Sequence, residues 1–191
     1  MNLDPFITMC RTAVAAPDPV VAVRSVVEDL VADPAPLAQA FPAPKMTLAV
    51  SGESKTVFED DTVSIMLVHA PPQVRQPPHD HRMSVVIGGY AGTELHRLYR
   101  RVPDEPADSQ PAIELTGTTD VAPGDVFTLG THGIHAIDAA VGQWSSAVHV
   151  YLGRLSALDR SLFHPETFVE EPLDLKVYDR YCERTAAATG E

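Results

Sequence analysis

The feature that most constrains the fold is a series of short apolar segments that begins near Met46 and continues to Leu152. Gly, Pro and Asp residues separate these segments at the spacing expected of an all-β sandwich or barrel. No helix-length periodic segment interrupts the series, which argues against a parallel α/β sheet. Residues 102–111, rich in Pro, Asp and Glu, are expected to form an exposed loop. The segments that we expect to form strands are Thr47–Val50, Thr56–Phe58, Val63–Val68, Met83–Ile87, Glu94–Tyr99, Ala112–Leu115, Asp125–Leu129, His135–Ile137 and Ser146–Leu152.

Helical patterning flanks this mainly β region. Residues 19–31 place apolar side chains at intervals of three and four, with Asp18 suited to cap the helix and Pro19 suited to its first turn. A shorter helix is expected before it, and a proline-rich connector after it. The predicted organisation is a helical segment packed on a barrel (residues 1–45), the β-barrel (46–172) and a C-terminal helix or tail (173–191).

The charge of the chain argues against nucleic acid and membranes as partners. With 26 acidic and 14 basic residues, the 191-residue chain has a net charge of -12 and would be repelled by polyanions. No run of 18 apolar residues suggests a membrane span, and the N-terminus does not resemble a signal peptide. Cys10 and Cys182 are too few and too far apart for a disulfide scaffold or a zinc cage. We therefore expect a cytoplasmic protein with reduced thiols.

Two histidines in the segment Pro78-His79-Asp80-His81 give the first chemical signal. Residues two apart in a strand face the same side, so His79 and His81 can point together into a barrel and bind one metal ion. The alternative is a pair of solvated or hydrogen-bonded histidines. The short motif alone does not decide between these interpretations.

A second segment, Pro123–Ile137, supplies a further histidine. A turn, a short apolar strand and a second turn lead to His135, which begins another strand. Taken together, the two segments resemble the paired motifs of the cupin superfamily, over about residues 63–155. The resemblance implies a double-stranded β-helix, or jelly-roll, barrel with a metal site formed by His79, His81 and His135. His132 competes for the third position, whereas His69, His96 and His164 are expected at the surface or behind the ligands.

The predicted ligand set contains no carboxylate. Many cupins have a glutamate ligand four residues after the second histidine, where this chain has Val85, and Glu94 follows too late. Three neutral imidazoles would leave the charge of the metal uncancelled, which favours an anionic ligand. Open coordination positions and histidine ligands suit Fe(II) best, with Zn, Ni, Cu or Mn as alternatives.

The set of three neutral ligands and the His-Asp-His motif resemble the metal site of the thiol dioxygenases. This is the family of cysteine dioxygenase and 3-mercaptopropionate dioxygenase. Residues 146–151 are similar to that family's S-x-H-x-Y segment, which implies a catalytic role for Tyr151 and His149. The family's serine position is Ala147 here, and whether Ser145 or Ser146 replaces it stays open. The alternative is a pair of core-facing side chains in a strand.

The substrate carboxylate has one candidate partner in the chain. Enzymes of the 3-mercaptopropionate type place an arginine nine residues after the tyrosine, and Arg160 stands there. A guanidinium suits a carboxylate because it donates two parallel hydrogen bonds. Arg160 could instead be a surface residue paired with Asp159 or Glu166. The cysteine that crosslinks the tyrosine in cysteine dioxygenases is replaced by Val86.

The chain as a whole looks most similar to a bacterial branch described as metal-dependent double-stranded β-helix enzymes. The resemblance implies an iron(II)-dependent dioxygenase that converts a small thiol bearing a carboxylate, together with dioxygen, into a sulfinate. Two alternatives stay open: another metal-dependent cupin enzyme, such as a carbon–carbon-cleaving dioxygenase or an isomerase, and a non-enzymatic metal-dependent binding protein. A homodimer is also compatible with the sequence.

Overall fold

The computed structural model describes residues 1–45, 50–102, 112–140 and 142–188. Most of the predicted strand Thr47–Val50 and of the loop predicted at 102–111 lies outside the described residues. The helices are α1 (Asp4–Ala13), α2 (Pro19–Val31), α3 (Ala35–Ala40) and α4 (Leu175–Ala188), with a 3-10 turn η1 (Leu155–Ala157). Among the described residues, no helix is both long and apolar enough to cross a membrane.

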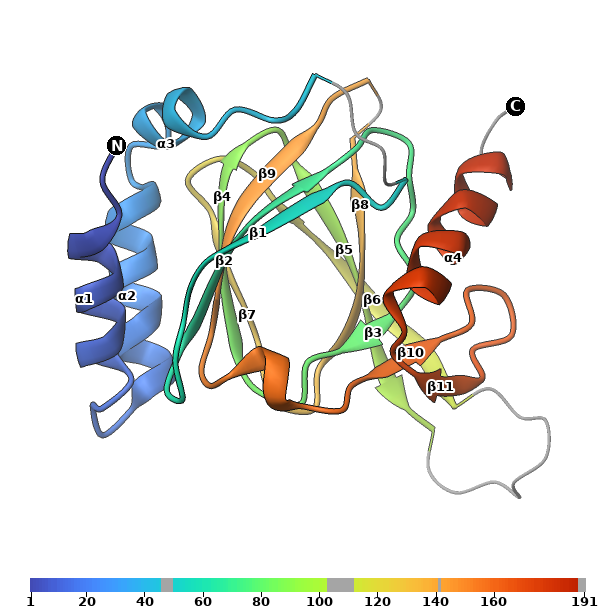
Figure 1. Ribbon diagram of the computed structural model, residues 1–191. Coiled ribbons are helices and arrows are strands. Elements are labelled where there is room, and N and C mark those ends of the chain that lie inside the picture. The colour runs from blue at the N-terminus through green and yellow to red at the C-terminus, as the bar shows by residue number, and fades with distance from the viewer. Residues whose placement is uncertain (46–49, 103–111, 141, 189–191) are drawn as a thin grey trace.

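The predicted N-terminal helix over residues 19–31 is confirmed as α2. The side chain of Asp18 accepts a hydrogen bond from the backbone N–H of Val21 at 3.2 Å, and proline occupies the first turn. The buried face of α2 repeats every four residues, through Val23, Val27 and Val31. This face covers the outer side of one sheet, and α1 packs beside α2 (Figure 1).

Glycine permits the close approach of α2 to the sheet. A Cβ atom at Gly88 would lie 2.6 Å from Val27 Cγ1 and 2.9 Å from Val31 Cγ1. Both distances are shorter than van der Waals contact, so a side chain here would push the helix away from the sheet.

The strands form two antiparallel sheets. Sheet I has the order β1-β2-β9-β4-β7 and sheet II the order β11-β10-β3-β8-β5-β6. The bounds are β1 (Glu53–Glu59), β2 (Ser64–Ala70), β3 (His79–Asp80), β4 (Val85–Ala91), β5 (Glu94–Arg101), β6 (Ile113–Val121), β7 (Val126–Leu129), β8 (Ile134–Ala139), β9 (Ser145–Tyr151), β10 (Ser161–Phe163) and β11 (Glu170–Pro172).

The strand pairing defines a jelly-roll. Strands β5 and β6 pair with each other, and moving outward along the chain β4 pairs with β7, β3 with β8 and β2 with β9, all antiparallel. The chain is therefore one long two-stranded ribbon that winds between the two sheets, which is the meaning of a double-stranded β-helix. The predicted fold class is thus confirmed as a mainly β jelly-roll. In place of the expected closed barrel, the described residues form two facing sheets, each with its own edges (Figure 1).

The sequence prediction missed two strands and made a third too short. Strand β6 extends to Val121, beyond the predicted end at Leu115, and β10 and β11 were not predicted. Most side chains of β6 are exposed or half-buried because it lies at the edge of sheet II. An edge strand in contact with water does not need the apolar run on which the prediction relied.

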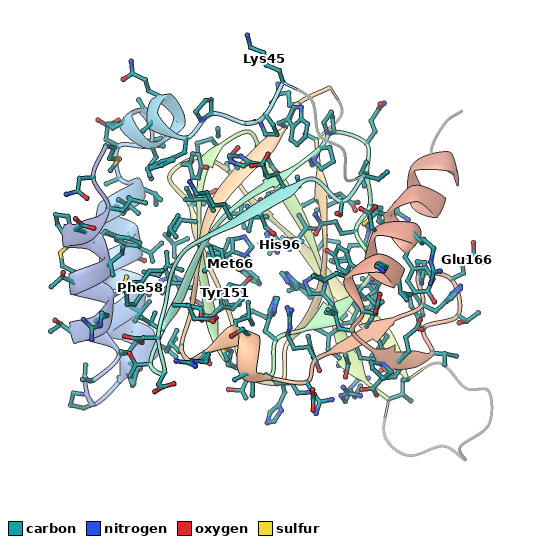
Figure 2. All side chains as sticks on the ribbon, in the orientation of Figure 1. Lys45, Phe58, Met66, His96, Tyr151 and Glu166 are labelled. Atoms are coloured by element: carbon teal, nitrogen blue, oxygen red, sulfur yellow. The ribbon has the colours of Figure 1, made fainter. Side chains whose placement is uncertain are left out.

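Side-chain alternation on β9 separates the core from a central cavity. Val148 and Val150 pack with the α2 side chains on the outer side of sheet I. Ala147 and Tyr151 point the other way, into the space between the sheets. Figure 2 shows Tyr151, Met66 and His96 in this interior, and Phe58 on the side that faces the helices.

Candidate metal centre

Sheet II brings the three predicted ligands together. His79 on β3 stands directly opposite His135 on β8, and His81 follows β3 by one residue. The nitrogen atoms that these three histidines can offer lie within 4.8 Å of one another, and all three side chains are buried. Asp80, between the two histidines, points away and accepts a hydrogen bond from the backbone N–H of Ser161 at 2.8 Å. The expected alternation of HDH is therefore present, and we call these residues the three-histidine group.

The spacing within the three-histidine group fits one metal ion. The Nε2 atoms of His81 and His135 are 3.0 Å apart. Two nitrogens bound at about 2.1 Å to one ion, at a right angle, would be separated by about 3.0 Å. His79 directs Nδ1 at the carbonyl oxygen of Pro77, 3.0 Å away. Because a carbonyl only accepts, this bond places the proton on Nδ1 and leaves the lone pair of His79 Nε2 available.

Burial keeps these imidazoles neutral. Burial lowers the pKa of His79 to about 4. The hydrogen bond to the Pro77 carbonyl opposes this effect in part, and the positive charge of Arg160 adds to it. Burial also lowers the pKa of His81 and of His135 well below the usual range, and neighbouring histidines add to the effect. Neutral imidazole is the form that binds metals, so little proton displacement opposes binding near neutral pH.

Glu94 and His96 lie immediately behind the three-histidine group. His96 Nδ1 is 3.0 Å from His135 Nδ1, and His96 Nε2 is 3.0 Å from Glu94 Oε2. The hydroxyl of Ser145 donates to Glu94 Oε1 at 3.2 Å. The sequence prediction placed His96 at the surface or behind the ligands, and the second option is confirmed. Glu94 was considered only as a ligand; the pattern Glu-x-His on one strand face could have shown that the two act together.

The Glu94 carboxyl is fully buried but held ionised. Burial alone would raise its pKa, but the hydrogen bond from His96 and the surrounding polar groups, His149 and Ser145 among them, outweigh that effect. The net result is that the pKa of Glu94 lies below its ordinary value. Negative charge is therefore present near the three-histidine group without being part of it.

Tyr151 and His149 form a hydrogen-bonded pair at the same centre. His149 Nδ1 lies 3.2 Å from the Tyr151 hydroxyl, and the Tyr151 ring lies 5.0 Å from the His81 ring, centroid to centroid. Burial raises the pKa of the Tyr151 hydroxyl and lowers the pKa of His149 to about 4, so both groups are neutral. In the described part of the chain, His149 Nε2 has no hydrogen-bond partner.

Neither candidate serine joins this pair. Ser145 donates to Glu94, as described above, and the Ser146 hydroxyl is 2.8 Å from Nδ1 of His69 on the neighbouring strand β2. The question left open by the sequence is thereby answered: no serine among the described residues replaces the serine of the S-x-H-x-Y segment.

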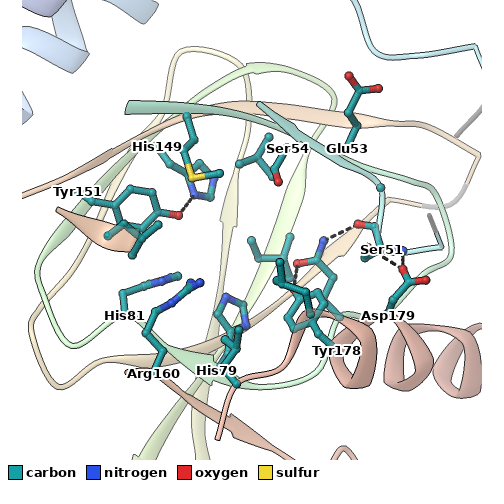
Figure 3. Close-up of a pocket in the computed structure, with 18 of the residues that line it drawn as sticks. Ser51, Glu53, Ser54, His79, His81, His149, Tyr151, Arg160, Tyr178 and Asp179 are labelled. Carbon is teal, nitrogen blue, oxygen red and sulfur yellow. Dashed lines mark hydrogen bonds between the residues drawn. The ribbon is translucent and has the colours of Figure 1, made fainter. Parts of the chain in front are cut away.

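Arg160 lines the same cavity as the three-histidine group. It precedes β10, which pairs with β3 so that Leu162 stands opposite His79. Figure 3 shows the guanidinium beside His79 and His81. None of the ion pairs found in the described ranges involves Arg160, and in particular it does not pair with Asp159 or Glu166.

The cavity is large, about 990 Å³, and helix α4 forms one of its walls. The Tyr178 hydroxyl donates to Gln76 Oε1 at 2.7 Å, and Asp179 accepts from the Ser51 backbone N–H and hydroxyl at 3.0 and 2.8 Å. The Tyr178 ring contacts His79, with ring centroids 5.4 Å apart. The sequence indicated a C-terminal helix but gave no sign that it borders the site. Apolar side chains line much of the rest: Met66, Val68, Ile137, Leu155, Leu173 and Leu175.

The remaining histidines lie away from the three-histidine group. His132, the competing third ligand, is exposed, as expected for a rim residue. His164 accepts hydrogen bonds from the backbone N–H groups of Glu166 and Thr167, each at 3.2 Å, and so stabilises a turn.

No known family model matches this sequence, and no curated protein matches it. Similar solved structures include a cupin superfamily protein from Desulfitobacterium hafniense, with 20% identity, TM-score 0.44, and coverage of 61% of this chain and 87% of that chain. A double-stranded β-helix protein from Klebsiella pneumoniae has 13% identity, TM-score 0.46, and coverage of 65% and 92%. The DMSP lyase DddQ from Ruegeria pomeroyi has 16% identity, TM-score 0.45, and coverage of 82% and 77%. The class of this protein follows from its own strand order and histidine geometry: a double-stranded β-helix jelly-roll with a three-histidine group able to hold a metal ion.

Proposed function

We propose that this protein is an iron(II)-dependent dioxygenase that oxidises a small carboxylate-bearing thiol to its sulfinate. The observation that supports the proposal most is the position of Arg160. Its guanidinium lines the cavity beside His79 and His81, and no ion pair within the described residues occupies it. A buried or half-buried cation beside a metal-binding group suits a substrate that carries an anion.

A divalent ion and the Arg160 guanidinium at the same end of the cavity would favour a doubly anionic substrate. Three neutral imidazoles do not cancel the charge of a divalent ion, so the centre attracts a thiolate. Arg160 offers a second positive charge for the carboxylate, through two parallel N–H donors. A mercapto acid presents these two groups a short distance apart.

Each residue of the site has a distinct part in the proposed reaction. When bound, a ferrous ion would supply adjacent positions for thiolate and dioxygen and the electrons for oxygen activation. Arg160 holds the carboxylate and so orients the sulfur. The Tyr151 hydroxyl keeps its proton and can donate a hydrogen bond to oxygen atoms at the reacting sulfur, and His149 fixes the orientation of that hydroxyl. The reaction balances as thiol plus dioxygen giving sulfinic acid, with both oxygen atoms entering the product.

The test is oxygen consumption by iron-loaded protein with a panel of thiols, followed by mass analysis of the products. We expect uptake with mercapto acids and a product heavier than the thiol by two oxygen atoms. The large cavity makes it worthwhile to include thiols with longer carbon chains. Absence of thiol-dependent uptake, with iron shown to be bound, would refute the proposal.

The same experiment identifies the alternatives. Cleavage or isomerisation of a hydroxy acid or enolate would indicate a different metal-dependent enzyme. A melting shift with a small anion, without turnover of any substrate, would indicate a binding protein.

A further inference from the structure

A buried series of four hydrogen-bonded side chains connects sheet I with the three-histidine group. Ser145 bonds to Glu94, Glu94 to His96 and His96 to His135, through contacts of 3.2, 3.0 and 3.0 Å. Each of the four side chains is at most 1% exposed. These contacts are therefore closed off from solvent along their whole length.

The chemistry of each group fixes the proton position of the next. An ionised carboxylate only accepts hydrogen bonds, so the bond between Glu94 Oε2 and His96 Nε2 requires a proton on that nitrogen. A neutral His96 then carries its lone pair on Nδ1, which faces His135 Nδ1. His135 must donate from Nδ1, and its lone pair is left on Nε2.

That lone pair lies in the right place to bind a metal. His135 Nε2 is 3.0 Å from His81 Nε2, on the inner side of the three-histidine group. The alternative, donation from His96 Nδ1 to His135 Nδ1, would place the His135 proton on Nε2 and remove the lone pair that faces the ion. Donation from His135 Nδ1 is therefore the arrangement that is compatible with bound metal.

We propose that Glu94 and His96 are positioning residues of the metal centre. They hold His135 in the tautomer that presents Nε2 to the ion, and they connect a carboxylate charge to an otherwise neutral ligand set. The proposal rests on metal binding by the three-histidine group, and it is independent of the substrate and of thiol oxidation.

The three ligands differ in how they are supported. His79 is oriented by the carbonyl of Pro77, and within the described residues His81 Nδ1 has no hydrogen-bond partner. Of the three ligands, His135 alone is connected to a carboxylate by the contacts among the described residues. The His96 ring also lies nearly parallel to the His135 ring, at 21° and 5.2 Å between centroids, so the contact restricts ring rotation as well.

The test compares Co(II) binding by the full-length protein and its variants. Glu94→Gln conserves volume but can donate to His96 Nε2, which would reverse the tautomers of His96 and His135. We expect Glu94→Gln and His96→Gln to weaken Co(II) binding about 10- to 100-fold in a chelator competition assay. We also expect altered visible absorption of the Co(II) that still binds.

His69→Gln is the matched control. His69 is also a buried histidine hydrogen-bonded to a β9 serine, but its hydrogen bond to Ser146 and its ring contact with Tyr90 lie outside the series that leads to His135. We expect His69→Gln to leave the Co(II) affinity and spectrum unchanged, whatever it does to stability. A folded Glu94→Gln variant that binds Co(II) with wild-type affinity and spectrum would overturn the proposal, as would a wild-type protein that binds no Co(II).

A second measurement keeps the proposal testable if the variants do not fold. Long-range ¹⁵N–¹H spectra of histidine-labelled wild-type protein, loaded with Zn(II), report which ring nitrogen carries the proton. We expect His96 protonated at Nε2 and His135 at Nδ1. The opposite tautomer at either residue would overturn the proposal. Neither measurement uses a thiol or oxygen, so failure here and failure of the proposed oxidation are distinguishable.

Discussion

Replacing Arg160 with glutamine is expected to remove the recognition of the substrate carboxylate. A guanidinium can donate two charge-assisted hydrogen bonds to a carboxylate, and each bond to a charged group contributes about 1.5–3 kcal/mol. Arg160 is half-buried, so solvent screens the pair and the lower end of that range applies. Two such bonds give about 3 kcal/mol, and about 1.4 kcal/mol corresponds to a tenfold change. We therefore expect kcat/KM to fall about a hundredfold.

The assay is oxygen consumption by iron-loaded Arg160→Gln with two thiols of equal length, 3-mercaptopropionate and 1-propanethiol. Only the first has the carboxylate, so only its kcat/KM is expected to fall. Arg154→Gln is the matched control, because Arg154 forms an exposed ion pair with Asp61 and does not line the cavity. An equal loss with both thiols, or no loss with either, would refute the assignment of Arg160.

The remaining predictions concern turnover, pH and packing. Tyr151→Phe is expected to lower kcat of the iron-loaded protein about 100-fold or more in the oxygen-uptake assay. Its Co(II) affinity, measured by chelator competition, should stay unchanged. An unchanged kcat would exclude a catalytic role for the hydroxyl. The folded-state pKa of His149, about 4, lies below the ordinary histidine value of 6.5. The unfolded chain therefore binds more protons between these values, and stability decreases as pH falls through this window. At about pH 5 this linkage lowers the free energy of unfolding by about 2 kcal/mol. Urea unfolding of the apoprotein between about pH 7.5 and 5 should therefore show a smaller loss of stability for His149→Gln than for wild type. Equal losses in the two proteins would contradict the lowered pKa of His149. Gly88→Ala is expected to lower the free energy of unfolding by about 1–3 kcal/mol, because its Cβ would overlap Val27 and Val31; an unchanged urea midpoint would show that α2 can move away without cost.

Periodicity in the sequence was sufficient to predict much of the fold and the first two ligands. The series of short apolar segments indicated a β sandwich or barrel, and the alternation of His79, Asp80 and His81 placed two imidazoles on one face. The helix at residues 19–31 and its Asp18 cap followed from side-chain spacing and capping chemistry. These features depend on interactions between residues close in the chain, which is why a single sequence contains them.

The location of Arg160 beside the histidines was decided by the tertiary structure. Arg160 is placed there by the pairing of β10 with β3, and β10 is a strand that the sequence did not predict. The approach of α4 to the cavity likewise depends on contacts of Tyr178 and Asp179 with distant residues. Helical periodicity predicts that a helix forms, but it does not indicate where the helix docks.

The connection from Glu94 through His96 to His135 could not be predicted, because His96 and His135 are 39 residues apart and meet through the register of β5 and β8. The sequence by itself determined which side chains are available and which of them share a strand face. Only the tertiary structure decided which faces meet, because pairing register and sheet packing are set by the burial of the whole core.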